Sequence, residues 1–595
     1  MLTSLSHRGP DETGAFHDPG GRVALGARRL SIIDIDGGHQ PMQNEDGTVT
    51  VVFNGEIYNH PMLRARLRAG GHRLATHADT EVLVHLYEEY GPQLVHALEG
   101  MYAFALWDAE RELLLLARDR FGEKPLVYVE RSGELAFASE LDALVAGGAC
   151  GWELDPEAID EYFTFGYINA PRSVVFGVRQ LPPGHTLVWR RGERSRVEPY
   201  WTPPAHADRL VGSLDELVLE TEAVLEDSVR SRLIADVPVG VFLSGGVDST
   251  LVAALAARNT TALRTFTVAY DAGRVGEASP ARKAAELIGA QHRELVFTTD
   301  DVAGSVPDYV AALDQPVADE AFVALRAVSD FARKEVKVAV GGEGADELFG
   351  GYPRYSWLAR AARLDGLPSA VRVRAAQLAS GLPGRGGRLG DVLAPMSFAD
   401  RHVDWVTSHR RRLRSVVYGP RLREHVERTK AEGRPRESQN GSIEGALMRL
   451  DQEHWLPGDV LAKADRASMQ ASLELRTPYL HRKVAEFAAT VPPVIHVSHR
   501  GKVLLRRVLQ RALPDAPYER AKTAFRTPTA EWLRGPLAPA IRDHLDTSSL
   551  YEDEWFDRGA VRHLVEEHVS GAADRTKVIW PLFVLGTWLD RRSSS

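Results

Sequence analysis

Residues 235–259 constrain the fold of this chain more than any other stretch. They begin with an apolar, β-branched run that is typical of a buried parallel strand, and Ser244-Gly245-Gly246 then interrupts it. From Asp248 onwards the residues suit a helix that begins with N-capping types. The free N–H groups of such a helix start attract anions, and the Asp248 carboxylate can hold Mg²⁺ on a polyphosphate. The stretch predicts a polyphosphate-binding strand–turn–helix unit, although the glycine pair alone also fits an ordinary turn.

A second β-rich run shows the same pattern further along the chain. Residues 336–340 end in glycines and are followed by Glu343, Asp346 and Glu347. Three carboxylates this close repel one another unless a cation lies between them. We therefore expect Asp248 and Asp346 to hold Mg²⁺ together.

The order of the predicted elements indicates two domains. After residue 206, helices and strands alternate, which favours a doubly wound parallel sheet with ligands at the carboxyl ends of its strands. Residues 1–205 favour short antiparallel strands in an α+β layout, with one clear helix at 80–91. The expected strands are 49–59, 104–110, 112–120, 126–130, 134–140, 263–270 and 292–297, and the other expected helices are 214–233 and 278–290. A polar stretch with two prolines at 200–215 is the expected linker, so the second domain is predicted to span 206–595.

Composition argues against several classes of protein. A net charge of −9 does not suit a general nucleic-acid surface, and no apolar run approaches the about 20 residues of a membrane span. The single cysteine, Cys150, rules out an internal disulfide, and nothing resembles a signal peptide, so we expect a cytoplasmic protein. The sequence leaves the oligomeric state open, with a homodimer as one compatible assembly.

Several motifs carry a resemblance to known families. The string SGGVDS resembles the pyrophosphate loop of the N-type ATP pyrophosphatases, and it lacks the lysine and the spacing of the loop GxxxxGK[ST]. Together with further motifs, it makes nearly the whole chain similar to the glutamine-hydrolysing asparagine synthetases. These motifs are RRLSIID (28–34), FNGEIYN (53–59), HADTEVL (77–83), RDRFGEKPLVY (118–128), GEGADELFGGY (342–352) and LPGDVLAKADRASMQASLELRTPYL (456–480). The resemblance implies an N-terminal Ntn-type antiparallel sandwich, then an α/β doubly wound sheet of the adenine nucleotide alpha hydrolase type with extra C-terminal helices.

The resemblance assigns glutamine binding to the first domain. Arg29 suits a carboxylate clamp and Asp79 suits an α-amino group, while Asn54 and the Gly55 N–H suit an oxyanion hole. The implied glutamine-binding residues are Arg29, Leu30, Ser31, Ile32, Ile33, Asn54, Gly55, Glu56 and Asp79.

The resemblance assigns ATP binding to the second domain. The implied ATP-binding residues are Leu243, Ser244, Gly245, Gly246, Asp248, Ser249, Val268, Gly342 and Glu343. Judged by residue type alone, Leu243 and Val268 favour core packing. Lys522 is the implied cation that stabilises charge on the α-phosphate and on the departing pyrophosphate.

The implied reaction joins a carboxylic acid to ammonia. The carboxylate attacks the α-phosphorus of ATP, which gives an acyl-AMP and pyrophosphate, and ammonia then attacks the acyl carbon. Glu343 is the expected acceptor of the ammonia proton, and Asp465 and Arg466 are the expected acceptor-binding residues. For the neighbouring Glu474 and Arg476, a buried ion-pair network fits about as well as a role in the site.

The nucleophile of the family's glutaminase is absent from this sequence. In the family it is a cysteine at the extreme N-terminus, whereas residue 2 here is Leu2, and Cys150 lies near the end of the first domain without a motif. We expect that Met1 matches an internal methionine of the family, through a misplaced start codon or truncation, and genuine loss of the cysteine is the alternative. As written, the chain is expected to need free ammonia.

Three departures from the family pattern bear on the acceptor acid. The family's DEP is Asp314-Gln315-Pro316, Gly341 stands where Ser or Thr is usual, and the family's LDH is Leu480-His481-Arg482. We expect these segments to flank the acceptor. Aspartate is the leading acceptor, and amidation of another carboxylic acid in natural-product biosynthesis is the alternative. A catalytically dead nucleotide-binding or regulatory homologue is a second alternative, whereas Glu343 argues against a β-lactam cyclase.

Overall fold

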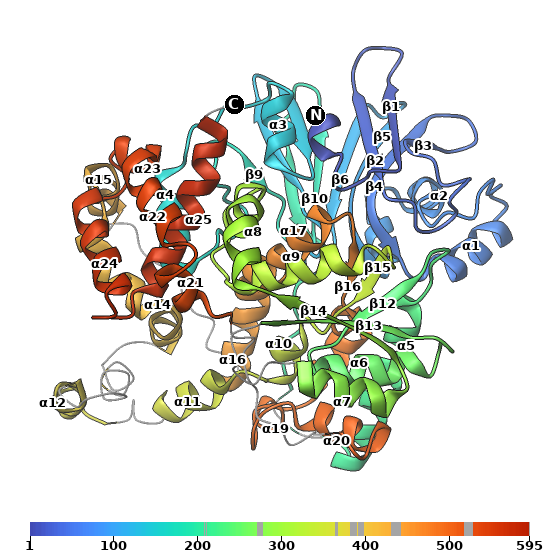
Figure 1. Cartoon of the computed structure of the whole chain (residues 1–595). Coiled ribbons are helices and arrows are strands. Elements are labelled where there is room, and N and C mark those ends of the chain that lie inside the picture. The colour runs from blue at the N-terminus through green and yellow to red at the C-terminus, as the bar shows by residue number, and fades with distance from the viewer. Residues whose placement is uncertain are drawn as a thin grey trace.

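The structure is a computed structural model of the chain. It describes residues 1–207, 209, 211–270, 278–362, 367–380, 390, 398–429, 442–516 and 527–593. In Figure 1 the antiparallel strands of the N-terminal part lie at the upper right, the parallel sheet lies below them, and the last helices of the chain lie at the left. Within these ranges, no helix has both the length and the apolar character needed to cross a bilayer.

The N-terminal part is built on a six-stranded antiparallel sheet in the order β11-β10-β6-β5-β4-β3. Its strands are β3 (Met42–Gln43), β4 (Val49–Ile57), β5 (Gly100–Asp108), β6 (Leu113–Arg118), β10 (His185–Arg190) and β11 (Arg196–Pro199). Side chains alternate between its two faces. Val51 and Phe53 face helices α1 (His60–Ala69) and α2 (Glu81–Tyr90), while Val52 faces two smaller sheets. Because both faces are buried, β6 is apolar over almost its whole length.

The smaller sheets form the second layer of this sandwich. One pairs β1 (Glu12–His17) with β2 (Ala24–Arg29), and the other has the order β8-β7-β9. Its strands are β7 (Val127–Arg131), β8 (Glu134–Ala138) and β9 (Arg179–Gln180). One apolar cluster joins the two layers, with Leu25 and Tyr128 from the small sheets and Trp107 from the large one. The expected antiparallel sandwich is therefore confirmed.

The C-terminal part contains an all-parallel sheet with the order β14-β13-β12-β15-β16. Its strands are β12 (Val239–Phe242), β13 (Arg264–Tyr270), β14 (Gln291–Phe297), β15 (Val338–Val340) and β16 (Glu474–Arg476). The order reverses between β12 and β15, which is the place where doubly wound sheets bind ligands. The expected doubly wound sheet is confirmed.

Helices cover both faces of the parallel sheet. One face packs on α5 (Leu214–Arg232), α6 (Val247–Ala257) and α20 (Val503–Ala512), and the other on α8 (Thr299–Ala311), α9 (Ala321–Ala332) and α17 (Ala462–Gln470). The additional C-terminal helices include α22 (Ala538–Thr547), α24 (Arg558–Val569) and α25 (Thr576–Ser593), which cluster at the left of Figure 1. Ser213 begins α5 with a capping box to Glu216, as its sequence predicts.

Candidate active site

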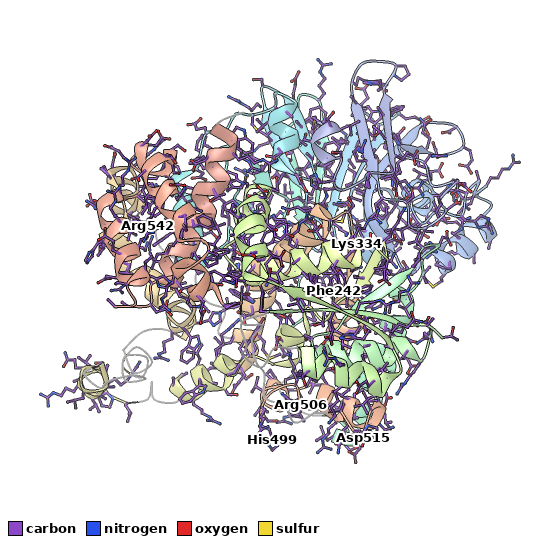
Figure 2. The ribbon with its side chains drawn as sticks, viewed as in Figure 1. Phe242, Lys334, His499, Arg506, Asp515 and Arg542 are labelled. Atoms are coloured by element: carbon purple, nitrogen blue, oxygen red, sulfur yellow. The ribbon has the colours of Figure 1, made fainter. Side chains whose placement is uncertain are left out.

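The first glycine turn leaves β12 at the carboxyl edge of the parallel sheet, directly after Phe242 (Figure 2). Gly245 has a φ of +72°, and a Cβ on it would lie 2.5 Å from the Pro280 carbonyl carbon. Only glycine fits there, because the backbone of α7 (Ala278–Ile288) is in contact with the turn. The Ser249 hydroxyl lies 3.0 Å from the Ser244 hydroxyl and accepts the Ser244 N–H, which fixes the turn against α6.

The second glycine turn leaves the neighbouring strand β15 at the same edge. Val239 of β12 pairs with Val338 of β15 in parallel, so both strands direct their carboxyl ends the same way. A Cβ on Gly342 would lie 3.2 Å from the Asp248 Cβ, which shows that the two turns touch. Gly344, with a φ of +88°, then begins the short helix α10 (Ala345–Phe349).

A lysine that sequence analysis missed joins the two turns. The Lys502 Nζ lies 2.6 Å from Asp248 Oδ2 and 2.6 Å from Asp346 Oδ1, and Lys502 is only 3% exposed. It immediately precedes α20, whose start lies between His499 and Arg506 (Figure 2). A lysine at the start of a helix is unfavourable, because the helix dipole is positive there. The position of Lys502 directly before a helix is therefore the feature of the sequence that could have indicated a special role.

Gly351 makes the approach of Lys502 feasible. A Cβ at this position would lie 1.9 Å from Asp346 Oδ1 and 2.1 Å from Lys502 Cε. The glycine therefore keeps open the space in which the ammonium and the carboxylate meet.

The two carboxylates also fit the expected magnesium ion. Their oxygens converge on one cation, and hard oxygen donors of this kind are the ligands that Mg²⁺ prefers. The second oxygen of Asp248, Oδ1, is buried and accepts no hydrogen bond within the described ranges. A buried carboxylate oxygen without a donor is costly, and a bound metal ion would supply the missing partner.

Glu343 folds back across its own turn. A Cβ on Gly341 would lie only 2.0 Å from Glu343 Oε2, so the absence of a side chain at position 341 makes room for this carboxylate.

Two neighbouring ionisable groups have raised pKa values. Burial and the nearby Asp346 raise the pKa of Glu347 to about 7, and the Tyr352 hydroxyl donates to Glu347 at 2.7 Å. Burial alone would lower the pKa of Lys463. Nearby acids, which include Asp319 and Glu343, outweigh this effect and raise the pKa.

The remaining ATP-site predictions fall on different environments. Leu243 is 1% and Val268 is 5% exposed, and the Leu243 N–H donates to the Phe266 carbonyl at 2.9 Å. Both side chains pack in the core, and Leu243 directly precedes the first glycine turn, whereas Val268 lies within β13 beside Leu295 of β14. Lys522 lies outside the described residues.

A cavity of about 790 Å³ lies in the N-terminal part and gathers most of the predicted glutamine-binding residues. The predicted residues that line it are Arg29, Leu30, Ile32, Ile33, Asn54, Gly55, Glu56 and Asp79. Ser31 is buried beside it, and its N–H donates to Asp11 at 2.9 Å. Met469 and Glu474 of the C-terminal part complete the wall, so the cavity reaches the boundary between the two parts.

Polar groups around this cavity have contrasting partners. The Asn54 Nδ2 is buried without an acceptor within the described ranges, which suits a donor that waits for an oxyanion. The Arg29 guanidinium donates to the carbonyls of Ile33 and Asp34 at 3.0 and 2.7 Å, so it also holds the loop that follows it. Burial raises the pKa of Asp79 to about 6, although the Ile57 N–H donates to its carboxylate.

Cys150 lies elsewhere. It packs against the apolar cluster that contains the C-terminal helices and does not line the cavity. Burial raises the pKa of its thiol, which opposes nucleophilic reactivity.

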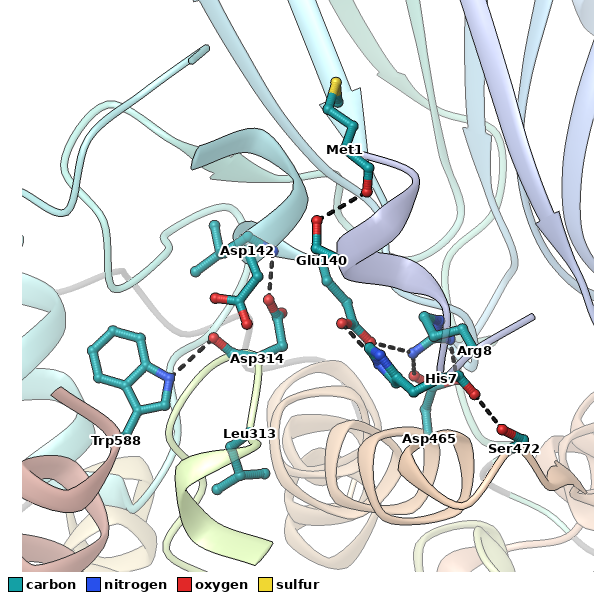
Figure 3. Close-up of polar contacts among 12 residues, drawn as sticks. Met1, His7, Arg8, Glu140, Asp142, Leu313, Asp314, Asp465, Ser472 and Trp588 are labelled. Atoms are coloured by element: carbon teal, nitrogen blue, oxygen red, sulfur yellow. Dashed lines mark hydrogen bonds and ion pairs between the residues drawn. The ribbon is translucent and has the colours of Figure 1, made fainter. Parts of the chain in front are cut away.

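Asp465 and Arg466 lie where the two parts meet. Arg8 donates to both oxygens of Asp465, at 2.8 and 2.9 Å, and to Glu140 at 2.9 Å (Figure 3). Arg466 lies in the electrostatic field of Asp314 and Asp465, and burial lowers its pKa. The role of this pair in acceptor binding stays a prediction, because in this structure Asp465 is engaged by the N-terminal part.

Two of the three departures from the family pattern lie at the same boundary. Gln315 is buried, and its amide oxygen accepts the Val174 N–H at 3.3 Å. His481 and Arg482 both contact Glu99, at 3.1 and 2.8 Å. The third departure, Gly341, lies in the second glycine turn, and Asp314 of the first lies near Arg466. The expectation that all three flank the acceptor stays a prediction.

Comparison with protein families covers both parts of the chain. A family described as "Glutamine amidotransferase domain" matches residues 1–201, and one described as "Asparagine synthase" matches residues 220–590. The chain belongs to the asparagine synthetase family. The resemblance noted in the sequence is thereby confirmed.

Full-length relatives agree with this family. "Asparagine synthetase [glutamine-hydrolyzing] 1" of Bacillus subtilis is 32% identical, over 99% of this chain and 92% of the relative. "Putative asparagine synthetase [glutamine-hydrolyzing]" of Mycobacterium bovis is 36% identical, over 98% and 92%. "Amidase chry2" of Gibberella zeae is 30% identical, over 91% and 86%. As a member of the asparagine synthetase family, the chain is a carbon–nitrogen ligase of the glutamine-dependent class.

Proposed function

We propose that this asparagine synthetase homologue adenylates a carboxylic acid with ATP and converts the adenylate to an amide. The observation that carries the proposal is the convergence of Asp248 and Asp346, which follow two adjacent strands. One oxygen of each carboxylate lies 2.6 Å from the same cation, the Lys502 ammonium. Mg²⁺ held by these two carboxylates would neutralise charge on the triphosphate. The turn around Gly245 would bind the pyrophosphate part, because the first N–H groups of α6 face it.

The remaining residues of the site divide the work. The acid's carboxylate attacks the α-phosphorus, and pyrophosphate leaves towards the start of α6. Ammonia then bonds to the acyl carbon, Glu343 takes a proton from its nitrogen, and the acyl–oxygen bond breaks to release AMP and the amide. Lys522 is proposed to stabilise the departing charge, and Asp465 and Arg466 to bind the acceptor.

Aspartate is the proposed acceptor, because the full-length relatives from Bacillus and Mycobacterium carry the name asparagine synthetase. The fungal relative named an amidase keeps a larger natural-product acid as the second candidate. We further propose a cytoplasmic location from the single cysteine and leave a homodimer as the assembly to test. The domain boundary near residue 205 stays a prediction.

ATP–pyrophosphate exchange tests the proposal. We expect exchange with aspartate and Mg²⁺, and a loss of about 100-fold or more in Asp248→Asn and in Asp346→Asn, because each change removes a charged metal ligand. Asp227→Asn is the matched control, since Asp227 is exposed on α5 and forms a surface ion pair with Arg230.

Three results would change the assignment. Undiminished AMP release by Asp248→Asn would refute the proposed site. Exchange with another acid but not with aspartate would indicate the natural-product alternative, and exchange with no acid would favour a nucleotide-binding homologue. Amide formation with ammonium or with glutamine in the same assay tests the predicted need for free ammonia.

A further inference from the structure

Four potential metal ligands meet at an edge of the N-terminal part, away from both sites described above. Glu45 lies in the turn between β3 and β4, His72 follows α1, and His85 and Glu88 lie on α2. One ligand atom from each lies within 4.8 Å of the others. Helix α2 and strand β3 lie side by side at the outer edge of the molecule (Figure 1).

The distances within this cluster match a small tetrahedral site. Glu88 Oε2 lies 3.0 Å from His85 Nδ1 and 3.3 Å from His72 Nδ1, and Glu45 Oε2 lies 3.4 Å from His85 Nδ1. Two bonds of about 2.1 Å at a tetrahedral angle place their ligand atoms about 3.4 Å apart. These three distances are close to that value, and all four ligand atoms lie within 4.8 Å of one another, so small side-chain shifts would complete the tetrahedron.

Each carboxylate is held by its outer oxygen, which leaves the inner oxygen for the cluster. The Arg73 N–H donates to Glu45 Oε1 at 3.0 Å, and the Asn44 amide donates to Glu88 Oε1 at 2.8 Å. Hydrogen bonds of this kind orient metal ligands in known sites.

The two imidazoles are arranged in the same way. The outer nitrogen of His72, Nε2, faces Glu89 Oε1 at 3.3 Å, so a carboxylate stands behind this ring, as it often does behind metal-bound histidines. The side chain of His85 is 2% exposed, and its Nδ1 faces the two glutamates. Lone pairs of two imidazoles and two carboxylates converge stably only when protons or a cation lie between them.

We propose that Glu45, His72, His85 and Glu88 bind one divalent transition metal ion of the Zn²⁺ class. Two nitrogen and two oxygen donors in a small tetrahedron suit Zn²⁺ better than Mg²⁺, which requires an octahedron of oxygens. The ion ties the β3–β4 turn and the segment after α1 to α2. The segment after α1 leads to Asp79, which lines the cavity of the N-terminal part described above, so the ion also steadies the wall of that cavity.

Metal analysis of the full-length protein tests the proposal. After incubation with Zn²⁺ and dialysis, we expect about one bound equivalent, and with Co²⁺ the intense visible bands of tetrahedral cobalt. His72→Gln and Glu88→Gln should each lose the ion and the bands. Both side chains are more exposed than His85, so these two variants are expected to fold.

Two control variants separate this site from other metal binding. His563→Gln changes an exposed histidine that lies 3.7 Å from Glu567, and it should keep the full equivalent. Asp248→Asn removes a ligand of the proposed magnesium site and should also keep the Zn²⁺. Substoichiometric Zn²⁺ in the unmodified chain, retention of the ion by His72→Gln and Glu88→Gln, or octahedral cobalt bands would each overturn the proposal.

Discussion

At the scale of single residues, Gly341 controls the position of the predicted proton acceptor. The Glu343 carboxylate occupies the space that a side chain at position 341 would fill. We expect Gly341→Leu, which is larger than the Ser or Thr usual in the family, to displace this carboxylate and to slow amide formation about tenfold, while ATP–pyrophosphate exchange stays close to the unmodified rate. Parallel assays of exchange and of amide product measure the two steps.

Gly304→Leu is the control for this substitution. Gly304 lies in α8, and a Cβ there would meet no heavy atom of the described residues within 4 Å. Equal rates of amide formation in Gly341→Leu and Gly304→Leu would show that the position of Glu343 does not limit the second step.

At the scale of elements, one buried acid connects three helices. Asp314 follows α8, its carboxylate accepts the Leu141 N–H at the start of α3 (Leu141–Ala146), and its carbonyl accepts the Trp588 indole N–H of α25 at 3.1 Å (Figure 3). Burial, with Glu140 nearby, raises the pKa of Asp314 from 3.8 to about 7.

This raised pKa predicts a pH dependence of stability. The folded chain binds the Asp314 proton more tightly than the unfolded chain does. The contribution of this group to the free energy of unfolding is therefore complete below about pH 4 and is lost as the pH rises through 7. Asp314→Asn should remove that loss and be the more stable protein at pH 8, as measured by urea unfolding at pH 5 and pH 8. The exposed Asp227→Asn should leave the slope unchanged, and a lower stability of Asp314→Asn at pH 8 would contradict the argument.

Local patterns predicted most elements well, and the failures are non-local. The expected strand at 49–59 and helix at 80–91 agree with β4 and α2 because alternating or helical apolar spacing sets them. The three-residue β16 has no such pattern, and only its pairing with β15 makes it a strand. In the same way both glycine turns were predicted from their sequences, whereas Lys502 reaches Asp248 across 254 residues of chain.

At the scale of the whole molecule, Arg476 joins the two parts of the chain. It is fully buried, and its guanidinium contacts Glu56 of the cavity wall at 3.0 Å and Glu474 at 2.8 Å. The sequence left open either a role in the site or a buried ion-pair network for Glu474 and Arg476, and the structure contains the buried ion pair. Arg476→Met would leave two buried carboxylates without their cation and should lower the free energy of unfolding by about 3–5 kcal/mol.

Denaturant unfolding of two further variants checks that expectation. Adding Glu56→Gln to Arg476→Met removes one of the stranded charges and should restore part of the loss. Arg282→Met breaks an exposed pair with Glu294 and should cost no more than about 1 kcal/mol. Similar costs for Arg476→Met and Arg282→Met would show that the buried pair does not hold the two parts together.

The ammonium of Lys502 occupies the place that the proposed magnesium ion would take. Because it already neutralises Asp248 and Asp346, it holds the two carboxylates together. Under the proposed function, a metal–nucleotide complex would have to displace this ammonium or share the carboxylates with it. Binding would then be an exchange of cations, in which free magnesium without a triphosphate would compete poorly.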